Sequence, residues 1–68
     1  MKFNWVDGFE INVKTDGKEV CISANKEGLL SLANHLINLA WQSDGHFHLD
    51  EGNSLEEGSA ELIVEKRD

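Results

Sequence analysis

The stretch from Ala24 to Asp50, ANKEGLLSLANHLINLAWQSDGHFHLD, decides the fold of this 68-residue chain. Its first part joins Asn25, a residue type favoured at helix N-caps, to apolar residues that recur every three or four positions. After Ser43-Asp44-Gly45, polar and apolar residues alternate as they do in a strand with one buried face. The stretch therefore predicts one long helix, a break and a strand.

The predicted helix carries more apolar surface than one small sheet can cover. Its stripe consists of Leu29, Leu32, Ala33, Leu36, Ile37 and Ala40, widened by Leu30, Leu39 and Trp41. The residues that remain to face water are Ser31, Asn34, His35, Asn38 and Gln42. We expect a helix of roughly 17 residues, covered by the sheet and by a further partner such as another subunit. Gly45 is expected to be the left-handed residue just after its C-cap.

A hairpin is predicted before the helix. Phe9, Ile11 and Val13 alternate with polar residues, and so do Val20, Ile22 and Ala24. Asp16-Gly17 lies between the two runs, and Asp-Gly suits a two-residue type I′ turn, in which both central residues need positive φ. Phe3 and Trp5 either continue the first strand through a bulge at Gly8 or form a separate short strand.

A second hairpin is predicted after the helix. Phe47 and Leu49 are expected to face the helix, and a polar segment, residues 51–59, leads to a strand with alternating Ala60, Leu62 and Val64. The chain is therefore predicted to be a single α+β domain over residues 1–68. Its single long helix packs on one face of a small, mostly antiparallel sheet, in the order β-hairpin, helix, β-hairpin. The opposite, polar face is expected to contain Glu10, Asn12, Lys14, Glu19, Cys21, Ser23, His46, His48, Asp50, Glu61, Ile63 and Glu65.

Composition excludes several classes of function. Six basic residues against thirteen acidic ones give a formal net charge of -7, which argues against a nucleic-acid partner because phosphate binding needs lysine and arginine. Cys21 is the single cysteine, so the chain has neither a disulfide framework nor a CxxC pair. The N-terminal residues contain no apolar run, which predicts neither a signal peptide nor a membrane span and favours a cytoplasmic protein. No cofactor is expected.

His46-x-His48-x-Asp50 is the one group with ligand-like spacing. Residues i, i+2 and i+4 of a strand share a face, so two imidazoles and a carboxylate could contribute to a metal site, with Cys21, Glu61 or Glu65 as a further ligand. The outer two side chains start about 13 Å apart along a strand, however, which is too far for one ion. A strand that faces solvent or a protein partner is the favoured interpretation.

No arrangement in the sequence predicts an enzyme. Serine, cysteine, histidine and aspartate all occur, but no local spacing sets them as a nucleophile with an oriented base. The paired acids Asp50-Glu51 and Glu56-Glu57 lie in a polar segment, where carboxylates are usually solvated. His35 is interpreted as a boundary residue of the helix.

Four motifs in order resemble the Imm32 family of immunity proteins from bacterial polymorphic toxin systems. They are NKEGLLSLANHL (Asn25–Leu36), Leu39-Ala40, HFHLDE (His46–Glu51) and LEEGSAELIVEK (Leu55–Lys66). The resemblance implies a small α+β protein that binds and neutralises a cognate toxin, with no catalytic residues to transfer. A basic nuclease toxin would complement the acidic segment. The candidate partner-binding residues are His46, His48, Asp50, Glu51, Glu56 and Glu57.

Two alternatives from other classes stay open at this point. The first is a small metal- or ligand-binding regulatory domain that uses His46, His48 and Cys21. The second is a homodimeric module in which the excess apolar surface of the helix and Trp41 are buried between subunits. The homodimer is compatible with an immunity function.

Overall fold

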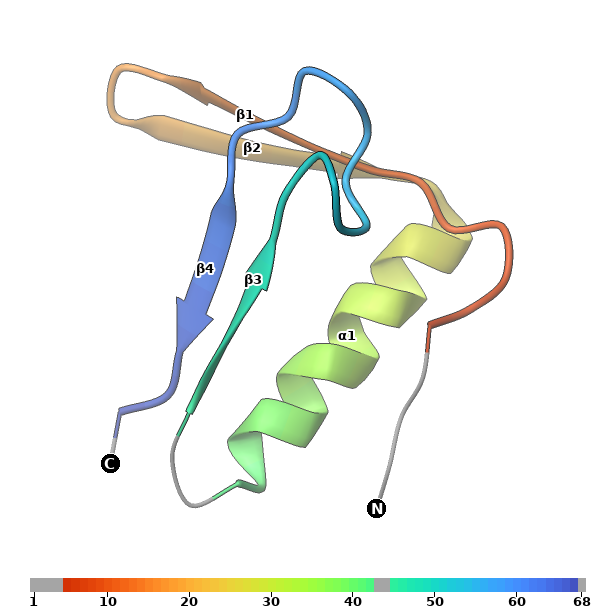
Figure 1. Cartoon of the computed structure of the whole chain (residues 1–68), viewed down its shortest axis with the longest axis vertical. Helices are drawn as coiled ribbons and strands as arrows, with labels where there is room; N and C mark the ends of the chain where they lie inside the picture. Colours follow the sequence, from red (N-terminus) through yellow and green to blue (C-terminus); the bar gives the residue numbers. More distant parts are fainter. Residues whose placement is uncertain (1–4, 43–44, 68) are drawn as a thin grey trace.

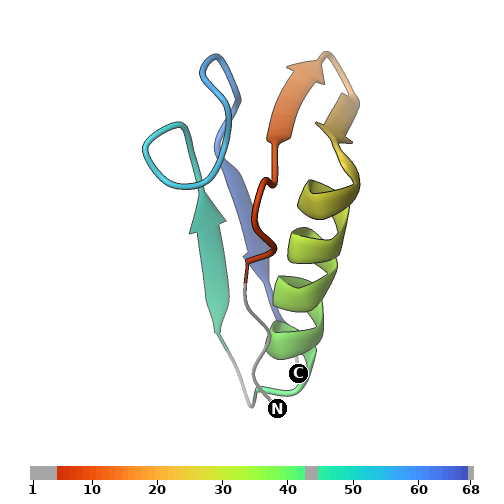
Figure 2. The same cartoon turned by 90° about the vertical axis from the view of Figure 1, so that its right-hand side faces the viewer.

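A computed structural model of the chain describes residues 5–42 and 45–67. The elements are β1 (Ile11–Asp16), β2 (Glu19–Ala24), α1 (Lys26–Ala40), β3 (His46–Leu49) and β4 (Leu62–Glu65). The helix lies alongside the β3–β4 hairpin, and the β1–β2 hairpin runs across one end of both (Figure 1). Figure 2 shows the same arrangement from the side, with α1 and β3 at opposite edges of the molecule. The predicted α+β class and the order hairpin, helix, hairpin are confirmed.

The strands form two antiparallel pairs, β1–β2 and β3–β4, where one small sheet was expected. The two pairs are nevertheless joined through the backbone. Glu56 N donates to Ile11 O at 2.8 Å, and Ala60 N donates to Val13 O at 2.8 Å. The free edge of β1 is therefore hydrogen-bonded to the segment that precedes β4, even though this segment is not itself a strand.

The turn between β1 and β2 lies one residue later than its predicted position. Asp16 pairs with Glu19, which leaves Gly17 and Lys18 as the central residues. Gly17 has φ 62°, and the only non-glycine residue with positive φ in the described ranges is Ser54, so Lys18 has a negative φ. One positive φ, at a glycine in the first central position, is typical of a type II′ turn. The prediction of a type I′ turn was wrong.

Asn25 is the N-cap of α1, as predicted, and also connects the helix to the segment before β1. Its Oδ1 accepts a hydrogen bond from Gly28 N at 2.7 Å and another from Glu10 N at 3.0 Å. Its Nδ2 donates to Gly8 O at 2.9 Å. One side chain therefore both starts the helix and fixes where it meets the chain entering β1.

The helix ends earlier than predicted. Ala40 is its last residue and Trp41 its C-cap, so Gly45, with φ 127°, lies well beyond the end of the helix. The last turn contains no basic residue. Instead Lys66, just after β4, donates from Nζ to Ala40 O at 3.0 Å and to Gln42 O. A cation thus satisfies terminal carbonyls at the negative end of the helix dipole.

The side of α1 that faces the rest of the protein is not the side that the apolar stripe predicts. The buried helix residues are Gly28, Ser31, Leu32 and Leu39. Of the predicted stripe, five members are exposed: Leu29, Ala33, Leu36, Ile37 and Ala40. Conversely Ser31, predicted to face water, is fully buried, and Asn34, His35 and Asn38 are half-buried. The expectation that this stripe is the side of the helix covered by the sheet, so that Leu29 to Ala40 supply the core, was therefore largely wrong.

Steric fit explains which side of α1 is buried. A Cβ atom at Gly28 would lie 2.4 Å from the backbone oxygen of Glu10, so the helix approaches this segment through a residue without a side chain. One turn later Ser31 Oγ accepts a hydrogen bond from Val6 N at 2.7 Å. The two smallest contact residues thus determine which side of α1 meets the N-terminal segment.

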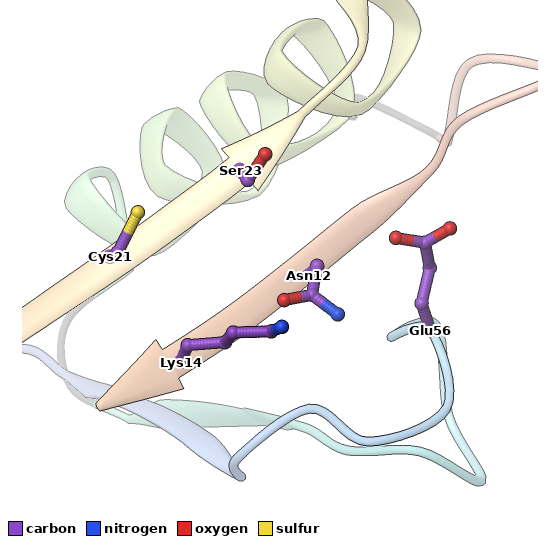
Figure 3. A pocket seen from close by; sticks show the side chains of 5 residues that line it. All are labelled: Asn12, Lys14, Cys21, Ser23 and Glu56. Atoms are coloured by element: carbon purple, nitrogen blue, oxygen red, sulfur yellow. The ribbon is translucent and has the colours of Figure 1, made fainter. Parts of the chain in front are cut away.

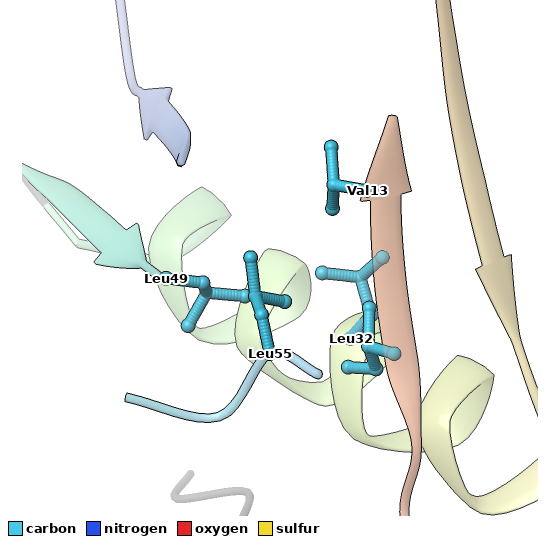
Figure 4. Packing of buried hydrophobic residues seen from close by; sticks show 5 residues of the cluster. Val13, Leu32, Leu49 and Leu55 are labelled. Carbon is cyan, nitrogen blue, oxygen red and sulfur yellow. The ribbon is translucent and has the colours of Figure 1, made fainter. Parts of the chain in front are cut away.

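The core is small and lies between β1, α1, β3 and the loop after β3. Its buried cluster consists of Ile11, Val13, Leu32, Leu49 and Leu55. Figure 4 shows how four of these side chains converge from the four segments. Val20 and Ile22 on β2 share the inner face of the hairpin but are 62% and 39% exposed. The predicted strand at Phe3 lies outside the described residues, and Trp5 is not part of a strand.

Candidate functional site

The outer face of the β3–β4 hairpin holds both predicted histidines. His46 and His48 are exposed, whereas Phe47 and Leu49 turn inward, as the alternation predicts. The two imidazole centroids lie 4.7 Å apart. His48 Nδ1 is 3.3 Å from Glu61 Oε2, a contact that is an ion pair only when the imidazole is protonated. The outer face of the β3–β4 hairpin therefore carries both imidazole and carboxylate groups.

Two of the predicted acidic site residues hold the loop after β3 in shape. Asp50 Oδ1 accepts a hydrogen bond from Gly52 N at 2.9 Å, and Glu51 Oε2 accepts one from Gly58 N. Asp50 is half-buried rather than pointing fully away. These two carboxylates are partly occupied by the loop backbone, so they are less available to a partner than Glu56 and Glu57, which are exposed.

Glu56 lies beside the outer face of the β1–β2 hairpin rather than beside the histidines. An open pocket of about 420 Å³ is lined by Asn12, Lys14, Cys21, Ser23 and Glu56. Figure 3 shows the first four on the paired strands and Glu56 on the loop across from them. The predicted grouping of the four strand residues on one face is confirmed. Glu56 joins them because its backbone N is bonded to Ile11 O.

The structure does not assemble the residues considered for a metal. Within residues 5–42 and 45–67, no group of three or more histidine, cysteine, aspartate or glutamate side chains could hold an ion. Cys21 lies on β2 and lines the pocket described above, whereas His46 and His48 lie on β3. Of the sequence candidates for a further ligand, Cys21 therefore lies apart from the histidines, whereas Glu61 contacts His48 and Glu65 pairs with His46 across the hairpin.

His35 has a packing role that its lone position in the sequence did not reveal. Its ring centroid lies 4.0 Å from that of Trp5 and 6.0 Å from that of Phe47. Its Nε2 is buried without a hydrogen-bond partner. Desolvation by burial lowers the pKa of His35 from its usual value of 6.5. The neutral imidazole is the form that fits this apolar position.

The helix of the described chain is too short and insufficiently apolar to cross a membrane. At 15 residues, α1 falls below the length that a bilayer requires.

Comparison with known proteins identifies a family for this chain. The model of the family described as Immunity protein 32 matches residues 19–67, which is most of the chain. A search of curated proteins finds no match, and neither does a search of solved structures. The matched range includes β2, α1, β3 and β4, and it contains all of the candidate partner-binding residues. This chain belongs to the Imm32 family of immunity proteins.

Proposed function

We propose that this protein binds a cognate bacterial toxin inside the producing cell and neutralises it without catalysis. The observation that carries the proposal is the family match over residues 19–67. The composition agrees with it, because a formal charge of -7 suits a partner with a basic surface, such as a nuclease. We expect this binding to take place in the cytoplasm.

We infer that the toxin contacts the surface formed by the loop 50–58 and the outer face of β3–β4. The candidate contact residues are His46, His48, Asp50, Glu51, Glu56 and Glu57, of which Glu56 lies at the end of this surface nearest the β1–β2 hairpin. Exposed carboxylates at Glu56 and Glu57 would attract a basic partner over long range, which mainly raises the association rate. Asp50 and Glu51 contribute by fixing the loop through their bonds to Gly52 and Gly58.

Charge reversal of exposed loop residues tests this surface. The toxin candidate is the protein encoded next to this chain, and binding is followed by stopped-flow fluorescence at several salt concentrations. Glu56→Lys with Glu57→Lys is expected to slow association by about tenfold or more at low salt and to flatten the salt dependence. The matched control, Asp16→Lys with Glu19→Lys, makes the same charge change at the exposed tip of the β1–β2 hairpin.

The two pairs of variants separate the function from the surface. If neither pair changes association but the wild-type chain still protects cells from the toxin, immunity stands and the proposed surface is wrong. If the wild-type chain neither binds nor protects, the assignment of this toxin as its partner is wrong. Circular dichroism of each variant verifies that the fold is retained.

A further inference from the structure

The outward side of α1 is apolar, uncharged and uncovered. Residues 28–42 contain no aspartate, glutamate, lysine or arginine. On this side Leu29 is 53% exposed, Leu36 44%, Ile37 41% and the C-cap residue Trp41 84%. Eight large apolar side chains of the described residues are exposed, against six in the core, and five of the eight belong to α1 or its cap. A chain with this balance has an apolar surface that is suited to burial.

The amount of surface fits one interface. The chain exposes 5086 Å², whereas a folded monomer of 7.6 kDa is expected to expose roughly 4,300 Å². The excess of about 800 Å² is comparable to the area that one partner buries in a protein interface of standard size. The surplus is therefore large enough for one interface of standard size.

The pattern of side-chain sizes on α1 favours a second copy as the occupant. Leu29, Ala33, Leu36 and Ala40, the outer seam, follow each other at steps of four, three and four, so they form one stripe along the helix. Large and small residues alternate along this seam. In an antiparallel copy related by a twofold axis between positions 34 and 35, Leu29 meets Ala40 and Ala33 meets Leu36.

This register is self-complementary, because every large residue of the outer seam faces a small one. Interdigitation of large and small side chains is what close packing of two helices requires, and an isologous interface requires a surface that matches itself. Ile37 and Leu30, which are also exposed, flank the seam. An unrelated partner would place no such constraint on the spacing of the two alanines.

The net charge of the chain is also consistent with a second copy packing on the outer seam. Two copies that each carry -7 repel each other most strongly across their acidic surfaces, so an uncharged surface is the one through which they associate at the least electrostatic cost. The outer seam provides such a surface, and the loop 50–58 belongs to a different part of the molecule. The acidic loop would thus remain free for a toxin in both copies.

We propose that this protein forms a twofold homodimer in which the α1 helices pack antiparallel through the outer seam. This proposal does not depend on the toxin or on the surface that the toxin contacts. The interface consists of Leu29, Ala33, Leu36 and Ala40, with Leu30, Ile37 and Trp41 at its margin.

Sedimentation equilibrium of the purified chain tests the interface. The wild-type protein is expected to sediment as a dimer that dissociates on dilution, and Leu36→Glu is expected to raise the dissociation constant at least about tenfold. Ile63→Glu is the matched control, because Ile63 is a similarly exposed apolar residue, 54%, on β4. It should leave the dissociation constant unchanged. A wild-type monomer at all concentrations, or equal weakening by both variants, would overturn the proposal.

Cysteine cross-linking tests the antiparallel register, with Cys21→Ser as the background. Positions 29 and 40 are about 16 Å apart along one helix, which is too far for a disulfide within a chain. The double variant Leu29→Cys, Ala40→Cys is expected to form a covalent dimer on oxidation, whereas neither single variant should. Cross-linking of the single variants would indicate parallel helices. Amide hydrogen exchange of α1 provides a second test. If the amides of α1 become protected only after the toxin is added, the outer seam is a toxin-binding surface and not a dimer interface. Either result contradicts the proposal.

Discussion

The inner and outer sides of α1 differ in a way that hydrophobicity alone does not predict. The inner side, which contacts the rest of the protein, includes a glycine, a serine and a histidine beside Leu32 and Leu39. The outer side carries leucines, an isoleucine and alanines and is exposed. The difference teaches that close approach between backbones, rather than the number of apolar residues, selects the contact side of a small helix.

Leucine truncation on the two sides should give the largest contrast. Leu32→Ala removes a buried core side chain and is expected to lower the free energy of unfolding by about 2–5 kcal/mol, whatever the protein concentration. Leu36→Ala should cost stability only at concentrations where the dimer forms, because its side chain is exposed in one chain. Urea unfolding at two protein concentrations measures both. If both variants lose the same free energy of unfolding at high dilution, the two sides of α1 do not differ as described.

Adding a methyl group at the closest contact should have the next largest effect. Gly28→Ala places a Cβ 2.4 Å from Glu10 O, so the helix must shift, and a net loss of about 1–3 kcal/mol is expected despite the better helix propensity of alanine. Gly52→Ala is the control, because its Cβ would meet only Asp50 Oδ1 at 3.6 Å. Thermal unfolding compares them. A Gly28→Ala protein that is more stable than wild type would refute the steric account.

Ser31→Ala should have an intermediate effect through a single hydrogen bond. The change leaves Val6 N without the acceptor that lies at 2.7 Å, and an unpaired amide in this position is expected to cost about 1–2 kcal/mol. Ser23→Ala, at an exposed position on β2, should change stability little. Urea midpoints of both variants provide the measurement, and indistinguishable midpoints would show that Ser31 is buried without being structurally important.

The pH dependence of stability should show the smallest effect, through His35. Its pKa in the folded protein is lowered by burial, so the unfolded chain binds more protons below the unfolded value of 6.5. The contribution of neutral His35 to the free energy of unfolding is therefore complete well above pH 6.5 and declines as the pH falls below that value. His35→Phe should reduce the change in urea midpoint between pH 7.5 and pH 5.5, whereas His46→Asn should retain it. An unaltered decline in His35→Phe would assign the effect to other groups.

The local structure of this protein follows from its sequence more readily than its packing does. Strand alternation predicts that Phe47 and Leu49 turn inward, and the side chain of Asn25 is a sufficient signal for the start of the helix. The apolar arc of α1 is wider than half of the helix, so periodicity cannot decide which part of the arc is buried. Gly28 decides it by allowing contact with Glu10, and that contact involves residues far apart in the chain.

The candidate surface was predictable in its residue types but not in its grouping. The exposed histidines follow from the alternation in β3, and the family follows from the order of the motifs. Glu56 and Cys21 share a pocket only because the segment before β4 bonds to β1, and this segment shows no alternation that would indicate such pairing. Likewise, no sequence spacing shows that Asp50 and Glu51 bind the backbone of their own loop.

The hydrogen bonds from Glu56 N to Ile11 O and from Ala60 N to Val13 O also affect when the protein can fold during its synthesis. They join positions that are separated by most of the chain, so β1 leaves the ribosome long before its second edge can be satisfied. Contacts of such long sequence separation form late and slow folding. The final fold of this protein is therefore expected only after translation of its last strand, and a chain halted before residue 56 would leave β1 open along one edge.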